Sequence, residues 1–270
     1  MRENWSLNIE NWANIPDLVA GFTFKNDHLN LGLHVGDKKE AVIRNRQIVA
    51  EALQFPLSKW VCAEQTHSDQ IVKVDAASAG KGSIDYQSSI PDTDGFYTAE
   101  KDILLTMCYA DCVPIFYLSL EKSLIGIVHA GRKGTTLNIA GKMIEVWQEK
   151  EQVAPEEIQV FIGPAICGNC YEVDDKAIAE TEALLGADAQ NVYQKIDKKL
   201  AARRLDLQSG RNLLDLKAVN FYNIINMGVP RQNIEISNYC TKCDDSLFFS
   251  YRRDHGYTGR MMAYMGWNGE

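Results

Sequence analysis

The segment ILLTMCYADCVPIFYLSLEKSLIGIV, residues 103–128, is the most informative part of this chain for its architecture. It contains three apolar runs, 103–107, 113–118 and 124–128, each with the length of a buried β-strand. Short polar breaks separate the runs, so the chain must turn between them. We therefore predict that these strands form the buried centre of the fold.

Outside this segment, helix and strand patterns alternate to the end of the chain. Strands are predicted at 19–24, 70–74, 159–162 and 233–237, and helices at 37–54, 136–149, 177–185 and 211–227. Asp37 and Glu40 form a capping-box pattern at the start of the first helix, and residues 80–95 are predicted to be a long loop. No linker rich in Pro, Ser or Gly divides the chain, so we expect one layered α/β domain over residues 1–270, with its strand order open.

The composition is that of an ordinary globular protein. Of the 270 residues, 46% are hydrophobic and 24% are charged, and this length suffices for a large core without disulfide or metal cross-links. The net charge of −8 argues against broad nucleic-acid binding, which depends on an excess of Lys and Arg. A small local anion site is compatible with this charge.

Neither an export signal nor a membrane segment is predicted. Residues 1–12 lack the basic start and apolar run of a signal peptide, and no stretch approaches the ~20 apolar residues that span a bilayer. The chain has 7 cysteines, an odd number that fits free or metal-bound thiols better than a disulfide framework. We therefore expect a cytoplasmic protein with no membrane partner.

Three potential metal ligands lie next to the ends of predicted strands. His67 precedes a strand, Cys112 lies in the polar break between two apolar strands, and His129 follows the third apolar strand. Side chains at strand ends can meet at one rim of a sheet, and two imidazoles with one thiolate would form a zinc site with an open fourth position. Their spacing is not a metal signature, so a core thiol and two histidines bonded to the backbone are the alternative.

Two Cys-x-x-Cys pairs, Cys167 with Cys170 and Cys240 with Cys243, could together form a second zinc site with four thiolates. However, 69 residues separate the pairs, whereas zinc ribbons keep about 15–20 residues between them. Neither pair clearly opens a helix after a strand, as a thioredoxin-like redox motif does. Ordinary buried or loop cysteines are therefore the preferred interpretation.

Three further motifs have a plain structural interpretation beside a functional one. HAGRKGT at 129–135 leads from a strand into a helix and could hold an anion through backbone N–H groups, or be a tight turn. PDTDG at 91–95 resembles part of a calcium loop, but its ligand series does not continue, so a turn is preferred. FFSYRRD at 248–254 could stack on a base and bind an anion, or form a surface ion pair.

Taken in order, these segments resemble the laccase-domain family, also called the polyphenol oxidoreductase or YfiH/YlmD family. The matching motifs are EQTH at 64–67, DTDG at 92–95, ADCVP at 110–114, HAG at 129–131, GP at 163–164 with residues 167–173, FFSYRRD at 248–254 and TGR at 258–260. Each motif is short, but their order makes the set specific. One position departs from the family pattern, because Arg132 replaces the usual Trp after the HAG turn while Lys133 keeps the basic position.

The resemblance implies an α/β layered (α+β) sandwich with mixed β-sheets and a zinc ion bound by His67, Cys112 and His129. It also implies phosphorolysis of adenosine, inosine, guanosine or methylthioadenosine, with adenosine deamination as a companion activity. A purine nucleoside and phosphate are then the expected partners. A true multicopper laccase does not fit, because the chain has 5 histidines and no His-x-His pair. Copper could still replace zinc, since Cu²⁺ binds such ligands more tightly.

The motifs also suggest roles for individual residues. Cys112 and the adjacent Asp111 are the predicted catalytic residues, with Asp111 as general acid or base and Glu64 as a second choice for that role. Gln65 is predicted to bind substrate. Four cations are candidates for binding phosphate: Arg46, Lys133, Arg253 and Arg132.

Other functions stay open at this point. A metal-dependent hydrolase of another amide or amine could use the same three ligands, and a copper-loaded chain could oxidise phenols. A non-catalytic zinc protein held by the two Cys-x-x-Cys pairs is the alternative from a different class. The oligomeric state does not follow from the sequence.

Overall fold

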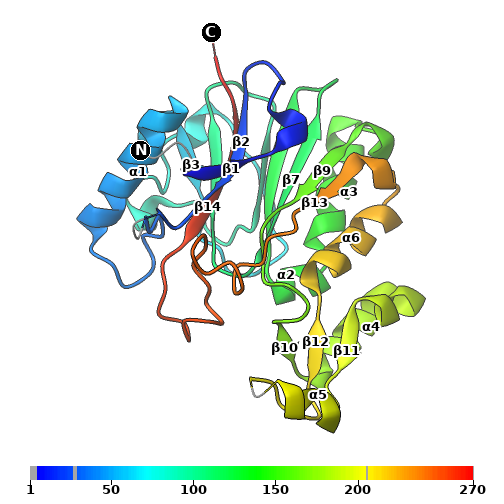
Figure 1. The fold of residues 1–270 in the computed structure, drawn as a ribbon. Helices are drawn as coiled ribbons and strands as arrows, with labels where there is room; N and C mark the ends of the chain where they lie inside the picture. The colour runs from blue at the N-terminus through cyan, green and yellow to red at the C-terminus, as the bar shows by residue number, and fades with distance from the viewer. Residues whose placement is uncertain (1–4, 27–28, 205, 270) are drawn as a thin grey trace.

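The computed structural model describes residues 5–26, 29–204 and 206–269 (Figure 1). The predicted central strands are present, and β7 (Val113–Ser119) pairs with β8 (Leu124–Ala130) as an antiparallel hairpin. This hairpin lies in the middle of a six-stranded sheet with the order β13-β9-β7-β8-β5-β4. The outer strands of this sheet are β4 (Ile71–Lys73), β5 (Gly95–Thr98), β9 (Gln159–Ile162) and β13 (Ile234–Ile236).

A second, five-stranded sheet has the order β1-β2-β14-β6-β3. Its strands are β1 (Ser6–Asn8), β2 (Leu18–Thr23), β3 (Trp60–Cys62), β6 (Leu104–Tyr109) and β14 (Met261–Trp267). Both sheets are mixed: β3 is parallel to β6, and β4 is parallel to β5, whereas most other neighbours are antiparallel. The strand β14 lies between β2 and β6 and so joins the two ends of the chain in one sheet.

The two sheets pack face to face around a common core. Successive side chains of a strand point to opposite faces, so Leu105 and Met107 of β6 lie in the same core as Phe116 of β7. The neighbouring Leu104 points the other way, into a separate core on the outer face of the five-stranded sheet.

Helices cover both outer faces and give four layers in the order α/β/β/α (Figure 1). α1 (Lys39–Leu53) packs on the five-stranded sheet through residues that include Leu53. α3 (Ile139–Glu151) and α6 (Leu216–Asn226) cover the six-stranded sheet, where the side chain of Trp147 is completely buried. The layered sandwich with mixed sheets is therefore confirmed.

A smaller three-stranded sheet with the order β10-β12-β11 extends from one end of the sandwich, at the lower right of Figure 1. Its elements, together with the nearby helices, are α2 (Arg132–Thr136), β10 (Glu172–Val173), α4 (Asp175–Leu185), β11 (Tyr193–Lys195), α5 (Lys198–Arg203) and β12 (Asn212–Leu214). Short 3-10 helices fill other connections: η1 (Glu10–Trp12), η3 (Leu57–Lys59), η4 (Ala76–Ser78), η5 (Tyr86–Ser88), η6 (Pro155–Glu157), η7 (Gly186–Asn191) and η8 (Arg231–Asn233). No helix within the described ranges has the length and apolar character needed to cross a bilayer.

The prediction of one helix over 211–227 is wrong, because the segment forms β12 followed by α6. β12 pairs with both β10 and β11. Asp215 then begins the helix, since its carboxylate accepts a hydrogen bond from the N–H of Ala218 at 3.1 Å. Leu214 fits the apolar pattern of either element, which is why periodicity alone placed it in the helix.

The helix predicted at 136–149 begins later, because α3 starts at Ile139 and only Thr136 of the predicted range belongs to the short helix α2. Asn138 between them has a left-handed backbone with a φ of 59°, and its side chain accepts a hydrogen bond from the N–H of Gly141 at 3.1 Å. The capping box predicted for α1 is also wrong. Lys38 is the N-cap without a side-chain hydrogen bond, while Asp37 accepts a hydrogen bond from a loop asparagine instead.

Candidate metal centre and its pocket

Three segments bring the predicted metal ligands together. His67 lies in the loop between β3 and β4, Cys112 in the turn between β6 and β7, and His129 near the end of β8. Their ligand atoms all lie within 4.8 Å of one another, and the Cys112 Sγ is 3.9 Å from the His67 Nε2. The arrangement that the strand ends suggested is therefore present in the fold.

Asp94 fixes both histidines of this centre. One oxygen of its fully buried carboxylate is 2.7 Å from the His129 Nδ1. The other accepts hydrogen bonds from the backbone N–H groups of Ser68 at 2.6 Å and Thr66 at 3.1 Å, which flank His67. With an ionised Asp94, the His129 Nδ1 carries the proton and its Nε2 keeps a lone pair for a metal.

The backbone around the ligands leaves little room for other residues. His67 has a φ of 61° and Asp111, just before Cys112, has a φ of 86°, both in the left-handed region. Gly131 is the first residue after β8 and lies two positions after His129. A Cβ atom at Gly131 would lie 2.6 Å from the His67 Cδ2 and 3.1 Å from the Cys112 Sγ. The glycine of the HAG turn is thus required by the close approach of the ligands.

The ligands polarise one another electrostatically. Burial would raise the pKa of the Cys112 thiol, but the charges and hydrogen bonds of His129 and His67 outweigh burial and lower this pKa to about 6. Burial would also lower the pKa of His129, yet the Cys112 thiolate and the Asp94 carboxylate raise it. The centre therefore favours a thiolate at neutral pH, which is the form that binds metals.

The donor set fits zinc. A tetrahedral zinc with Zn–N near 2.05 Å and Zn–S near 2.3 Å separates its nitrogen and sulfur ligands by about 3.6 Å. The observed separation of 3.9 Å between the Cys112 Sγ and the His67 Nε2 is close to this value. Three protein ligands leave the fourth position to a reactant, as in catalytic zinc sites. The same ligands also suit copper.

The centre opens into a pocket of about 480 Å³. Its lining combines the three ligands with aromatic, cationic and small residues: His34, Gln65, Cys108, Ala110, Asp111, Tyr171, Tyr251, Arg252 and Arg260. A pocket of this size can enclose a small organic ligand.

Two arginines and two tyrosines form paired walls of this pocket. The guanidinium of Arg252 lies 4.9 Å from the ring centroid of Tyr171, and that of Arg260 lies 5.9 Å from the ring centroid of Tyr251. Each guanidinium also donates a hydrogen bond to the backbone. Arg252 donates to the carbonyl of Glu172 at 3.0 Å, and Arg260 donates to the carbonyl of Thr258 at 2.9 Å. These contacts hold two cations at the pocket, and no acidic side chain of residues 5–26, 29–204 or 206–269 pairs with either guanidinium.

Asp111 and Gln65, predicted from the motifs, both line the pocket, but their polar atoms are engaged by the protein. The Asp111 carboxylate accepts hydrogen bonds from the Thr241 hydroxyl and the Arg252 N–H, both at 2.6 Å. The Gln65 side chain pairs with the backbone N–H and C=O of Cys108 at 2.8 and 2.9 Å. Both residues therefore shape the pocket wall through these bonds.

None of the four cations predicted to bind phosphate lines this pocket. Arg46 is buried and its guanidinium donates to the carbonyl groups of residues 31, 82 and 83. The guanidinium of Arg253 donates to other backbone carbonyls and to Asp254. Lys133 is exposed on α2, and Arg132 forms an ion pair with Glu180 at 2.6 Å.

Asp94 and His34 are site residues whose part the sequence did not reveal. Asp94 lies near the end of the predicted loop 80–95, in a DTDG motif that was interpreted as a turn and matched to the family, but no role was predicted for its carboxylate. His34 lies on the connection between β2 and α1, far in sequence from the other pocket residues, and the fold brings it to the pocket without any sequence motif that marks it. The TGR motif at 258–260 did contain a usable signal, since its Arg260 lines the pocket.

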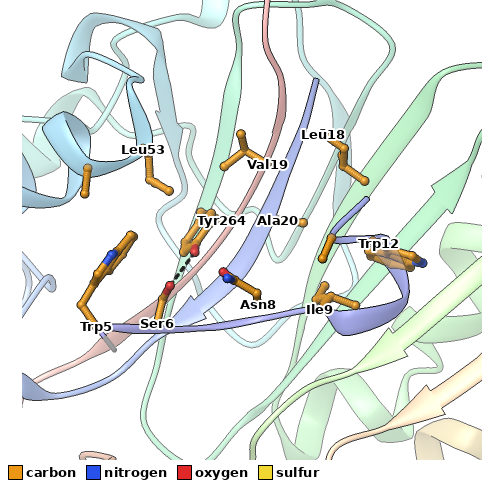
Figure 2. Close-up of a pocket in the computed structure, with 12 residues that line it drawn as sticks. Trp5, Ser6, Asn8, Ile9, Trp12, Leu18, Val19, Ala20, Leu53 and Tyr264 are labelled. Carbon is orange, nitrogen blue, oxygen red and sulfur yellow. Dashed lines mark hydrogen bonds between the residues drawn. The ribbon is translucent and has the colours of Figure 1, made fainter. Parts of the chain in front are cut away.

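A second cavity, of about 360 Å³, lies on the outer face of β1 and β2 (Figure 2). Trp5 stacks on Tyr264 there with ring centroids 5.8 Å apart, and the Tyr264 hydroxyl is 2.9 Å from the Ser6 hydroxyl. The described residues that line this cavity include no Cys, His, Asp, Glu, Lys or Arg. This cavity therefore offers no charged side chain and no metal ligand of these types among the described residues.

Comparison with known proteins gives consistent matches along nearly the whole chain. A family model described as multi-copper polyphenol oxidoreductase laccase matches residues 21–268. The purine nucleoside phosphorylase YlmD of Geobacillus stearothermophilus is 41% identical over 256 residues, which cover 92% of this chain and 89% of that protein. The protein of the same name from Bacillus subtilis is 40% identical, with coverages of 97% and 94%. The crystal structure of the hypothetical protein YfiH from Bacillus licheniformis superposes with a TM-score of 0.92 at 40% identity, covering 99% of this chain and 98% of that one.

Proposed function

This chain belongs to the multi-copper polyphenol oxidoreductase laccase family, as its ordered motifs predicted, and from that premise we propose that it is a zinc-dependent purine nucleoside phosphorylase. The proposed substrates are adenosine, inosine, guanosine and methylthioadenosine with phosphate, and deamination of adenosine is a proposed companion activity. Relatives of similar length that carry the name purine nucleoside phosphorylase support the reaction class.

One observation carries the proposal: a thiolate and two imidazoles with room for one cation lie at a pocket that also holds two arginines. Phosphorolysis needs both features. A phosphate oxygen forms a bond to C1′ of the ribose while the C1′–N9 bond breaks, and the purine leaves with the electron pair and takes up a proton. The attacking group is an anion, so cations must hold it beside the sugar.

Arg252 and Arg260 are the proposed phosphate ligands, because a guanidinium presents paired N–H donors to an oxyanion. They lie beside Tyr171 and Tyr251, whose rings offer apolar faces for the purine or the ribose. His34 adds a neutral group: burial and the charges of Arg260 and Arg46 lower its pKa to about 4. At pH 7 its ring therefore donates one hydrogen bond and accepts another.

When bound to His67, Cys112 and His129, zinc would supply a Lewis acid in this pocket. The protein's own contribution is to hold the ligands through Asp94 and to keep the reactants beside them. For Asp111 we propose a positioning role, since its carboxylate joins the Cys112 turn to the backbone of Arg252.

The test is product analysis by mass spectrometry with zinc-loaded protein. Inosine with phosphate should give hypoxanthine and ribose 1-phosphate, and adenosine alone should give inosine by deamination. Cys112→Ser should reduce both activities at least 100-fold, because the thiolate ligand of the metal is lost. Circular dichroism should show that the fold is kept.

Cys62→Ser is the matched control, because Cys62 is a free thiol outside the pocket and bonds to the Thr106 hydroxyl, which a serine can also do. This variant should keep both activities. If inosine is cleaved equally well without phosphate, giving free ribose, the protein is a hydrolase and the proposal fails. Full activity of Cys112→Ser would also contradict it.

A further inference from the structure

The four cysteines of the two Cys-x-x-Cys pairs form a cluster apart from the three-ligand centre. The sulfur atoms of Cys167, Cys170, Cys240 and Cys243 all lie within 4.8 Å of one another. All four are free thiols, with Cys170 and Cys240 buried and Cys243 exposed. The long separation in sequence, which argued against a joint site, is thus closed by the fold.

Backbone pairing brings the two turns together. Ala165 and Cys240 form a parallel bridge, and the N–H of Thr241 donates to the carbonyl of Ala165 at 3.1 Å. Each pair lies on a tight turn: the Cys170 N–H donates to the carbonyl of Cys167, and the Asp244 N–H donates to the carbonyl of Cys240, both at 2.9 Å. The N–H of Cys167 also points at the Cys240 Sγ at 3.3 Å, which is how backbone groups stabilise a thiolate.

The spacing of the sulfurs matches a tetrahedral metal site. Four thiolates around zinc with Zn–S near 2.3 Å lie about 3.8 Å from one another. This value lies between the 3.3 Å that separates the Cys170 and Cys243 sulfurs and the 4.8 Å within which all four sulfurs lie. A disulfide needs sulfurs about 2.05 Å apart, much closer than the 3.3 Å between Cys170 and Cys243, so the spacing fits a tetrahedral metal site better than a disulfide.

Nearby cations can balance the charge of such a site. Zn²⁺ with four thiolates carries a net charge of −2. The ammonium of Lys217 is buried, donates to the carbonyl of Ser237 at 2.6 Å and lies within electrostatic reach of Cys240 and Cys167. The guanidinium of Arg204 also lies within electrostatic reach of Cys170 and Cys243, but it is already paired with Asp206 at 2.8 Å, so Lys217 is the main compensating cation.

We propose that these four cysteines bind a second zinc ion with a structural role. Binding converts four thiols to thiolates and releases their protons to solvent. Four protein ligands fill the tetrahedron, so this ion keeps no position for a reactant.

The proposed ion lies next to the wall of the pocket. Thr241, between the cysteines of one turn, donates to the carboxylate of Asp111, and the guanidinium of Arg253 donates to the carbonyl of Thr241 at 3.0 Å. Tyr171 follows Cys170 directly and faces Arg252. A metal that joins the two turns would therefore fix the positions of the Tyr171 and Arg252 side chains.

The experiment is metal analysis of chain purified under reducing conditions and loaded with zinc, followed by removal of free metal. We expect two zinc ions per wild-type chain and one in the double variant Cys170→Ser/Cys243→Ser, which removes one ligand from each turn. Cys112→Ser should also keep one, and Cys62→Ser should keep two. Equal zinc content in the wild type and the double variant, whether one or two ions per chain, would overturn the proposal, whereas one ion in the wild type and none in the double variant would instead argue against the three-ligand centre.

A spectroscopic measurement covers the case in which the double variant does not fold. Cobalt(II) added to the Cys112→Ser chain should bind with one equivalent and show strong sulfur-to-cobalt charge-transfer absorption, as expected for tetrahedral thiolate ligands. Absence of this band while the four thiols titrate as reduced would refute the second site. The proposed catalytic activity could then still be correct, since it rests on other residues.

Discussion

Asp94→Asn provides the sharpest test of how the metal centre is held. The substitution keeps the shape of the side chain but leaves one oxygen in place of two. If that oxygen accepts from Ser68 and Thr66, the amide N–H₂ faces the His129 Nδ1 and forces that nitrogen to become an acceptor. The proton of His129 then moves to Nε2, the atom that should bind the metal.

The expected loss follows from the geometry. Removing a partner that orients a metal-bound histidine costs about 10–100-fold in metal affinity, or about 1.4–2.7 kcal/mol. Asp94 is completely buried, so losing one charge-assisted hydrogen bond should also lower the free energy of unfolding of the metal-free chain by about 1.5–3 kcal/mol. Competition with a chelator at pH 7 measures the first quantity, and urea unfolding measures the second.

Asp92→Asn is the matched control, because Asp92 belongs to the same motif but is exposed, and within the described part of the chain its side chain bonds only to the Thr66 hydroxyl. Its zinc affinity should stay within about twofold of the wild type. Equal affinity of Asp94→Asn and wild type would refute the reasoning. So would an equal loss in both variants, since it would indicate a general effect of the loop.

The same carboxylate predicts a pH dependence of stability. Burial alone would raise the pKa of Asp94, but its bonds to His129 and Ser68 lower the pKa below the ordinary value. The unfolded chain therefore binds the proton first as the pH falls. The stabilising contribution is complete above about pH 4 and is lost as the pH drops through the folded-state pKa. In urea titrations of metal-free chain, Asp94→Asn should lack this part of the acid destabilisation.

Two further variants test the ligand geometry and the pocket. Gly131→Ala should weaken zinc binding at least tenfold in the same chelator assay, because the new Cβ would lie 2.6 Å from the His67 Cδ2; Gly36→Ala, where no atom lies within 4 Å, should have no effect. Arg260→Ala should raise the KM for phosphate about 10–100-fold through the loss of a charged donor. Arg231→Ala, which removes a guanidinium stacked elsewhere on an aromatic ring, should leave this KM unchanged, and a comparable rise in both variants would contradict the assignment of Arg260.

The strands that the sequence predicted best are those with continuous apolar runs. β7, β8 and β9 are buried on both faces, so nearly every position is apolar and the strands can be recognised without knowing which strands pair with them. β14 was not predicted, because Met261–Trp267 contains methionine, glycine and alanine and no Val, Ile or Thr, although all seven of its residues are buried. Its place in the sheet depends on pairing with β2 and β6, which lie far from it in sequence.

The clustering of the three proposed metal ligands was predictable for a similar reason, whereas the residues around them were not. His67, Cys112 and His129 belong to motifs at strand ends, and strand ends meet at the rim of a sheet. The cations of the pocket come instead from the C-terminal turns, so the sequence could not distinguish the pocket-facing Arg252 from its neighbour Arg253, whose guanidinium caps backbone carbonyls. The two arginines have the same chemistry, and only the backbone conformation of the turn determines which side chain points into the pocket.

The strained backbone near the proposed ligands is held by the protein itself, so we expect this centre to be formed before a metal binds. Left-handed conformations at His67 and Asp111 cost about 1–2 kcal/mol each in non-glycine residues. Hydrogen bonds that do not involve a metal hold both: Asp94 binds the backbone on either side of His67, and Thr241 binds the carboxylate of Asp111. Because the fold itself meets this cost, metal binding needs little rearrangement of the chain. The affinity for zinc should therefore respond to Asp94 and Gly131 more strongly than to the global stability of the protein.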